Sequence, residues 1–245
     1  LGASTGGLFQ PIRAAEGEQF KLTMAAKSTE PTAWFAAGLA FFDAAWNELG
    51  DTSQPIRSSA YAPYSFFSVA PPNTAYVQPY TWAENGTGSI WADDFCLTRS
   101  TEQFVDSGTN YLPNPGFEAG LTGWQTSGSV ASVADAHSGA KAIRIGTTNS
   151  GVERAFGALP GQQFTLSAWA KTTESAWQGL ALRFQDANNQ TVGQELEVRV
   201  SSPTYKKYVI SGTAPAGTAQ VIVSLWKDPG SGAVWLADLF LATSS

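Results

Sequence analysis

Four side chains in the second half of the chain have the chemistry to hold a flat, hydroxyl-bearing ring: Trp169, Arg183, Gln185 and Trp226. Indole faces stack against ring ligands such as sugars, because both surfaces are flat and apolar. The planar guanidinium and amide groups form hydrogen bonds with hydroxyls and so fix the orientation of the ligand. The four residues therefore predict a surface on which a glycan could rest.

The pattern around these residues places them on strands. In the segments 164–171 (FTLSAWAK), 180–186 (LALRFQD) and 221–227 (VIVSLWK), apolar residues recur at every second position. Side chains alternate between the two faces of a strand, so one set points inward and the four residues point to solvent. An alternative stays open, in which these tryptophans pack under loops or against a neighbouring module. We expect three other tryptophans to anchor the core or loops: Trp124, Trp177 and Trp235.

The chain contains a long internal repeat. The segment 17–34 (GEQFKLTMAAKSTEPTAW) matches 161–177 (GQQFTLSAWAKTTESAW), and Ala70–Leu97 matches Ala214–Leu241. Most matched positions are 144 residues apart, as Phe20 and Phe164 are. A match of this length indicates two copies of one folded unit, each with its own core.

The strand and turn pattern predicts an all-β protein with two tandem antiparallel β-sandwiches of the jelly-roll type. We assign residues 1–99 to the first sandwich, 100–110 to a linker and 111–245 to a complete second sandwich. The opening segment 111–146 has no match in the first copy. The first sandwich is therefore expected to lack its N-terminal strands, which are either upstream, absent by truncation, or donated by a neighbouring chain.

The first copy has different chemistry at the positions of the candidate surface. Only one tryptophan is kept, and the matched strand exposes Gln78, Tyr80 and Trp82 together. These three residues predict a second, more aromatic carbohydrate-binding patch. The alternative is an interface, with self-association through the first module.

Composition excludes several classes of partner. The chain has 14 basic and 20 acidic residues and a net charge of −6, which argues against nucleic acid as a partner. No apolar run is long enough to span a membrane. The single cysteine, Cys96, excludes an internal disulfide and is expected to be a buried core thiol, because its counterpart is Phe240. No catalytic motif for hydrolysis, phosphate binding or dinucleotide binding is present.

Several motifs resemble one family. The segments NPGFEAGLTGW, DAHSGAKAIRI, PGQQFTLSAWAK and VWLADLFL are similar to those of carbohydrate-binding modules of the family 4/9/22 type. The resemblance covers Tyr111–Leu241 and, without the opening motif, Gly17–Leu97. It implies jelly-roll modules attached to secreted bacterial enzymes that degrade polysaccharides, and hence an extracellular or cell-surface location.

The resemblance also implies a structural calcium ion in the second copy. The positions that match the family site are the carboxylates of Glu118 and Asp238, with backbone oxygens near Ser138 and Lys141. Calcium prefers six to eight hard oxygen ligands, which this set can supply in part. The alternative is that both carboxylates accept hydrogen bonds from loop groups without a metal. The only histidine, His137, is expected to be a loop residue.

Two functions follow from these observations. The first is non-catalytic binding of a polysaccharide by tandem modules of a secreted bacterial protein. The second is a structural role in an extracellular filament, surface layer or phage tail, with a strand donated to the first sandwich. Sandwich modules of this kind serve both purposes, so the fold alone does not separate them.

Overall fold

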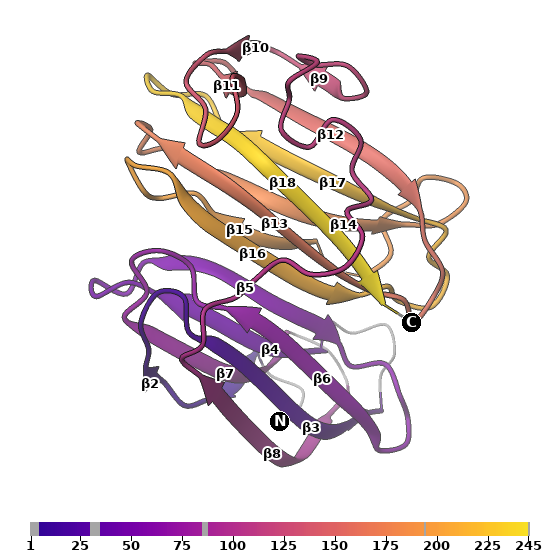
Figure 1. The fold of residues 1–245 in the computed structure, drawn as a ribbon. Coiled ribbons are helices and arrows are strands. Elements are labelled where there is room, and N and C mark those ends of the chain that lie inside the picture. The colour runs from indigo at the N-terminus through magenta and orange to yellow at the C-terminus, as the bar shows by residue number, and fades with distance from the viewer. Residues whose placement is uncertain (1–4, 30–34, 85–87, 194, 245) are drawn as a thin grey trace. The chain divides into compact units, whose positions relative to one another are not determined.

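The computed structural model describes residues 5–29, 35–84, 88–193 and 195–244. Contacts divide the chain into two compact units, Leu1–Phe104 and Val105–Ser245. Each unit consists of two layers of antiparallel strands (Figure 1). The described residues form no helix with the length and apolar character that crossing a membrane requires.

The first unit has one sheet in the order β1-β7-β4-β5, with β2 also paired to β7, and a second sheet in the order β6-β3-β8. The alternation of apolar and polar residues in 17–28 is that of β3, whose even-numbered side chains are buried. The strands are β1 (Gly6–Phe9), β2 (Ile12–Arg13), β3 (Gln19–Ser28), β4 (Phe35–Phe42), β5 (Glu48–Pro55), β6 (Ala62–Val69), β7 (Tyr76–Ala83) and β8 (Ile90–Ser100).

The second unit has one sheet in the order β15-β14-β17-β12-β9 and a second in the order β10-β11-β18-β13-β16. The strands are β9 (Gln125–Ser127), β10 (Val130–Val133), β11 (Ala142–Ile145), β12 (Ser150–Gly157), β13 (Gln163–Thr172), β14 (Gln178–Gln185), β15 (Leu196–Arg199), β16 (Lys206–Thr213), β17 (Gln220–Lys227) and β18 (Val234–Ser244). Both units are all-β sandwiches, which confirms the predicted fold class.

The repeat is also a repeat of structure. Shifted by 144 residues, β12 falls on β1 and β2, and it pairs with β17 as these strands pair with β7. The described residues of the first unit contain no counterpart of β9, β10 or β11. The segment that carries these three strands is the one that the sequence comparison left unmatched.

Each unit has its own core, as the repeat predicted. The side chains expected to face inward on β13, β14 and β17 are at most 3% exposed: Phe164, Leu166, Ala168, Leu180, Leu182, Phe184, Val221, Val223 and Leu225. Trp124 also lies in this core, against Phe117. Each such aromatic or aliphatic side chain contributes roughly 1.5–3 kcal/mol by burial, so the two sandwiches are stabilised chiefly by these faces.

The prediction for Cys96 is wrong. Its thiol is exposed, because Cys96 lies opposite Thr23 on the outer face of the β3–β8 pair. A bulge shifts the register of this pair between Thr23 and Ala25, near Asp94, which has a φ of 55°. An extra residue in a strand reverses the face on which the following side chains lie.

Candidate functional site

The outer face of the sheet β15-β14-β17-β12-β9 is hollowed into an open cleft of about 440 Å³. The central strand β17 places Trp226 opposite Gly179 on β14 and Gly151 on β12. Because both glycines lack side chains, indole rings can lie directly on the sheet at these two positions. The cleft is lined by Gln125, Thr126, Ser127, Gly151, Val152, Glu153, Trp177, Ala181, Arg183, Glu195, Glu197, Ser224 and Trp226.

Two tryptophans line this cleft. The six-membered ring of Trp226 lies over Gly151, and its Nε1 donates a hydrogen bond of 3.0 Å to Asn149 Oδ1. Trp177 lies against Gly179, where a Cβ atom would be 2.6 Å from Cη2 of the indole. Both indoles are half-buried, so each keeps surface free for contact with a ligand. The two glycines allow the rings to lie low on the sheet.

Charged side chains also line the cleft, around Arg183 on β14. The Arg183 guanidinium is 3.2 Å from Glu153 and 4.0 Å from Glu195, measured between nitrogen and carboxylate oxygen. Burial raises the pKa of Glu195, while Arg183 lowers it and Glu153 raises it further. Glu197 also lines the cleft, so three acidic residues and Arg183 are among its lining residues. The cleft therefore offers many acceptors for hydroxyl groups and an excess of negative charge.

The four residues expected to form one surface do not all lie together. Trp226 and Arg183 line the cleft, and Gln185 lies on the same face beyond Arg183, where Gln220 donates a hydrogen bond of 3.0 Å to its Oε1. Trp169 lies on β13, in the opposite sheet, so the prediction that it shares this surface is wrong. Alternation shows that a side chain points outward but not from which of two sheets it points.

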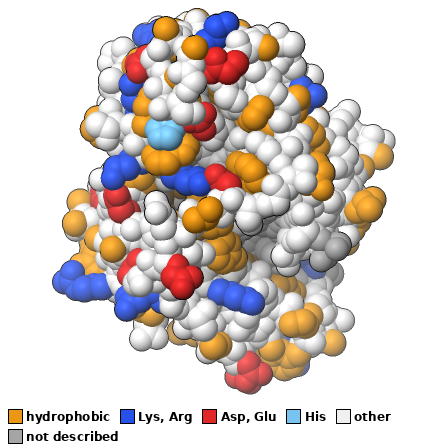
Figure 2. All heavy atoms as spheres, in the orientation of Figure 1, with side chains coloured by type: hydrophobic (Ala, Val, Ile, Leu, Met, Phe, Trp, Pro, Cys, Tyr) orange, Lys and Arg blue, Asp and Glu red, His pale blue; other side chains and the backbone are white. Residues whose placement is uncertain are grey.

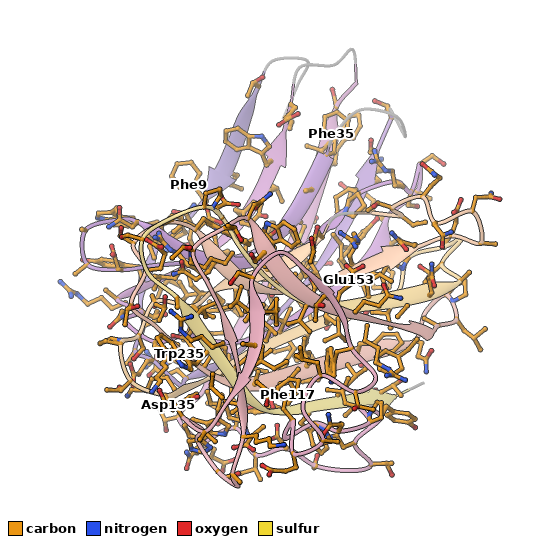
Figure 3. All side chains as sticks on the ribbon, turned by 90° about the horizontal axis from the view of Figure 1, so that it is seen from above. Phe9, Phe35, Phe117, Asp135, Glu153 and Trp235 are labelled. Atoms are coloured by element: carbon orange, nitrogen blue, oxygen red, sulfur yellow. The ribbon has the colours of Figure 1, made fainter. Side chains whose placement is uncertain are left out.

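Trp169 is covered on one side by a loop. The His137 ring stacks on it at 3.7 Å between centroids and 9° between planes, and His137 Nδ1 lies 2.6 Å from Asp238 Oδ2. The single histidine is visible at the surface beside hydrophobic groups in Figure 2. In Figure 3, Trp235 and Asp135 lie together, while Glu153 of the cleft lies apart from them. One face of the Trp169 indole is therefore covered by His137, and the rest of the side chain stays partly exposed.

Trp177 was expected to be an anchor, and instead it contributes to the cleft. Its position is set by the loop between β13 and β14, in which Glu174 accepts hydrogen bonds from the amides of Ser175 and Ala176. One signal in the sequence could have identified it, namely the glycine two residues later, Gly179, which leaves room for the ring. Trp235, by contrast, lies within cation–π distance of Lys171 and Arg144, outside the cleft.

In the first unit, Gln78, Tyr80 and Trp82 lie at alternate positions of β7, on one face, and all three are half-buried. Trp82 lies over Gly7, as Trp226 lies over Gly151. The Tyr80 hydroxyl donates a hydrogen bond of 2.7 Å to Asp51, and burial raises the pKa of both groups. The shared face is as expected.

The aromatic patch of the first unit is larger than predicted. Trp46 stacks on Tyr76 at 4.5 Å between ring centroids, with Phe42 at 5.6 Å from Trp46, and Arg13 lies over Tyr76. Trp46 is 49% exposed. Ala40 stands at the position that matches Arg183 of the second unit. This face therefore has aromatic side chains but no guanidinium group at that position.

The candidate calcium ligands meet in one loop cluster of the second unit. Glu118 Oε1 accepts hydrogen bonds from the amides of Ala140 (2.9 Å) and Lys141 (3.2 Å), and Asp238 Oδ1 accepts one of 2.8 Å from the Ser138 hydroxyl. Both acidic side chains approach Gly116, where a Cβ atom would lie 3.8 Å from Asp238 Oδ1 and 3.9 Å from Glu118 Cγ. Two carboxylates and a hydroxyl are hard oxygen donors, which suits calcium. Among the described residues, no three acidic, histidine or cysteine side chains form a metal-binding group.

Comparison with known proteins identifies one family. A family model described as "Carbohydrate binding domain" matches residues 109–232, which is half of the chain and contains all the residues that line the cleft. No curated protein matches the sequence.

Solved structures of similar fold share little sequence with this chain. The N-terminal CBM22-1-CBM22-2 tandem domain of Xyn10C from Paenibacillus barcinonensis is 11% identical, covering 94% of this chain and 80% of that one, with a TM-score of 0.45. A "Family 16 Carbohydrate Binding Module-2" is 20% identical over 54% of this chain and 99% of its own, with a TM-score of 0.49. The tailspike protein 4 of bacteriophage CBA120 is 15% identical over 55% of this chain and only 21% of its own, with a TM-score of 0.49. At these values the similarities carry no functional inference.

Proposed function

This chain belongs to the carbohydrate-binding domain family, and from that membership we propose that its second unit binds a polysaccharide in the cleft of the β15-β14-β17-β12-β9 sheet. The observation that supports this most is the pair of half-buried indoles, Trp177 and Trp226, over glycines in one open cleft. A sugar chain would lie across these rings, and its hydroxyls would donate to Glu153 and Glu195 and accept from Arg183.

The binding is expected to be weak for a single unit. A sugar face that covers about 100 Å² of indole contributes ~2.5 kcal/mol, and two such contacts about 5 kcal/mol before the cost of immobilising the ligand. The role proposed for Gln185 is secondary, because it lies beyond Arg183 and is engaged with Gln220. For Trp169 the covered position no longer supports a role in this site.

We propose that the cleft binds without catalysis. A glycosidase needs two carboxylates that reach the scissile bond from separate positions. Here Glu153 and Glu195 both face the same guanidinium, Arg183, in an arrangement that suits hydrogen bonding to a chain of hydroxyls. Release of reducing sugars by the purified chain would contradict this proposal. We propose, from the same family membership, an extracellular location as part of a secreted bacterial protein.

The charge of the cleft predicts the class of glycan. We expect gels that contain a neutral β-linked plant or algal polysaccharide to retard the chain, and polyuronate gels to retard it at least about tenfold less, because three acidic residues and only one arginine line the cleft. Affinity electrophoresis at low and high salt measures both. Equal or stronger retardation by the polyuronate would contradict the assignment of the ligand to this cleft.

The first unit offers a second candidate surface through Gln78, Tyr80 and Trp82. We propose that it binds glycan more weakly than the cleft of the second unit does, because Ala40 and Phe42 stand at the positions of Arg183 and Gln185. Its exposed aromatic cluster around Trp46 favours a second candidate role, self-association of the chain. Sedimentation over a range of protein concentrations, with and without glycan, separates these two roles.

We also propose that calcium stabilises the second unit through Glu118, Asp238 and the Ser138 region, including backbone oxygens near Lys141. A calcium concentration about 100-fold above its dissociation constant is expected to raise the melting temperature by about 5–10 °C. Glu118→Gln should remove most of this rise, while the exposed Glu102→Gln, outside the loop cluster, should keep it. A melting temperature that is the same in calcium and in chelator would contradict the proposal.

A further inference from the structure

The strand β8 lies at the edge of the β6-β3-β8 sheet of the first unit. Its counterpart in the second unit, β18, pairs with β13 on one side and with β11 on the other. Among the strands that the structure describes, β8 pairs only with β3. One side of β8 therefore presents backbone donors and acceptors where the second unit has a paired strand.

The apolar face beside this edge is less covered than in the second unit. There, Leu236, Leu239 and Leu241 of β18 are at most 3% exposed and share a core with side chains of the segment 111–146. The matched residues of β8 are more accessible: Ala92 and Leu97 are half-buried, and Phe95 is 40% exposed. Strand β8 thus keeps the apolar side chains of β18. The described residues of the first unit contain no segment that packs over them as residues 111–146 do in the second unit.

Two polar features of β18 are also retained on β8. Trp235 lies within cation–π distance of both Lys171 and Arg144, at 5.3 and 5.5 Å. In the first unit, Trp91 matches Trp235 and Lys27 matches Lys171, and the Lys27 ammonium lies 5.1 Å from the Trp91 ring. Trp91 is 41% exposed, so its ring has surface free for a second cation, as Arg144 provides for Trp235.

The second retained feature is an aspartate at a bulge. Asp238 and Asp94 both have positive φ, 48° and 55°, beside matching shifts of register. The Asp238 carboxylate accepts a hydrogen bond from the Ser138 hydroxyl and contacts the His137 ring. No hydrogen bond reaches the Asp94 carboxylate from the described residues. A positive φ costs a non-glycine residue conformational free energy. In the second unit, this backbone conformation directs the Asp238 carboxylate toward the 111–146 segment.

We propose that the β8 edge is an acceptor site for a polypeptide segment with the chemistry of residues 111–146. The segment would pair with β8 as β11 pairs with β18, place a basic residue over Trp91, and place hydroxyl or imidazole donors at Asp94. Its apolar side chains would cover Phe95 and Leu97. The charges are complementary at the matched positions, because His137 of the model segment would lie at Asp94 and Arg144 would lie over Trp91.

A synthetic peptide of residues 111–146 tests this site on the full chain. We expect saturable one-to-one binding by calorimetry, with slower hydrogen exchange of β8 amides. Trp91→Ala and Asp94→Asn should each weaken binding by about tenfold, since each removes one cation–π contact or one charge-assisted hydrogen bond. Both residues are exposed, so these variants are expected to fold.

Matched controls come from the repeat. Trp235→Ala alters the same position of the second unit, where the site is already filled, and should leave peptide binding unchanged. A peptide with Arg144→Ala should bind about tenfold more weakly. Absence of binding, or binding that is insensitive to Trp91 and Asp94, would overturn the proposal. So would concentration-dependent dimers of the chain that Trp91→Ala abolishes, because the edge would then belong to a second copy. Glycan binding does not enter these outcomes.

Discussion

Replacement of both cleft tryptophans, Trp177→Ala and Trp226→Ala, is expected to abolish retention of the chain by a neutral polysaccharide. Each indole face contributes ~2.5 kcal/mol of contact, so a single replacement should weaken binding by about 60-fold. Affinity electrophoresis and calorimetry with a soluble oligosaccharide measure the effect. The fold should persist, because both rings are half-buried on the outer face of the sheet and lie outside the core.

The matched control is Trp169→Ala, on the opposite sheet. It removes a partly exposed indole of the same unit without touching the cleft, and binding should stay within about twofold, since no ligand contact is lost. Loss of binding in this variant, with full binding in the Trp177 and Trp226 variants, would move the site to the other face.

A smaller change tests the geometry of the cleft. Gly179→Ala places a methyl group 2.6 Å from the ring of Trp177, so the ring must turn away and binding should fall by about tenfold. Gly157→Ala is the control, because a Cβ atom there meets nothing within 4 Å. If both variants bind equally well, the orientation of Trp177 does not matter for recognition.

The second large effect is expected at a buried ion pair near the cleft. Lys227 is completely buried, and its Nζ lies 3.0 Å from Glu174, which also accepts a hydrogen bond of 2.7 Å from the Gly232 amide. The pair joins the loop that carries Trp177 to the loop after β17. The matched residue in the first unit is the buried Ala83, so the fold itself does not require a lysine here.

Lys227→Ala is expected to lower the melting temperature by about 5–15 °C, because it leaves the carboxylate in a buried position without its partner. The double variant Lys227→Met with Glu174→Gln should recover most of this loss, since neither charge then remains. Thermal unfolding monitored by circular dichroism measures both. A single variant as stable as the unmodified chain would show that the pair contributes nothing.

The same pair predicts part of the response to acid. Hydrogen bonds from the Ala176 amide, the Lys227 ammonium and the Gly232 amide lower the pKa of Glu174 to about 2, from the usual value of 4.5. A lowered pKa in the folded state stabilises the protein above pH 4.5, and this stabilisation is lost as the pH falls toward 2. The double variant should show a shallower loss of stability over this range. An unchanged slope would contradict the role of Glu174.

The sequence alone was sufficient for the architecture. The alternation of apolar residues in 164–171 and 221–227 identified strands and their buried faces, because strand periodicity is a local property. The unmatched segment 111–146 likewise marked where the two units differ.

Only the tertiary structure decided which outward residues meet. Trp169 and Trp226 have the same local pattern, yet they lie on opposite sheets, because pairing between distant strands assigns each strand to its layer. Trp177 was missed for the same reason, since it joins the cleft from a loop by lying over Gly179 on a strand. Cys96 is exposed because a bulge reversed the face of β8. The alternation of apolar and polar residues depends only on neighbours in the sequence, whereas a binding surface depends on contacts between residues far apart in the chain.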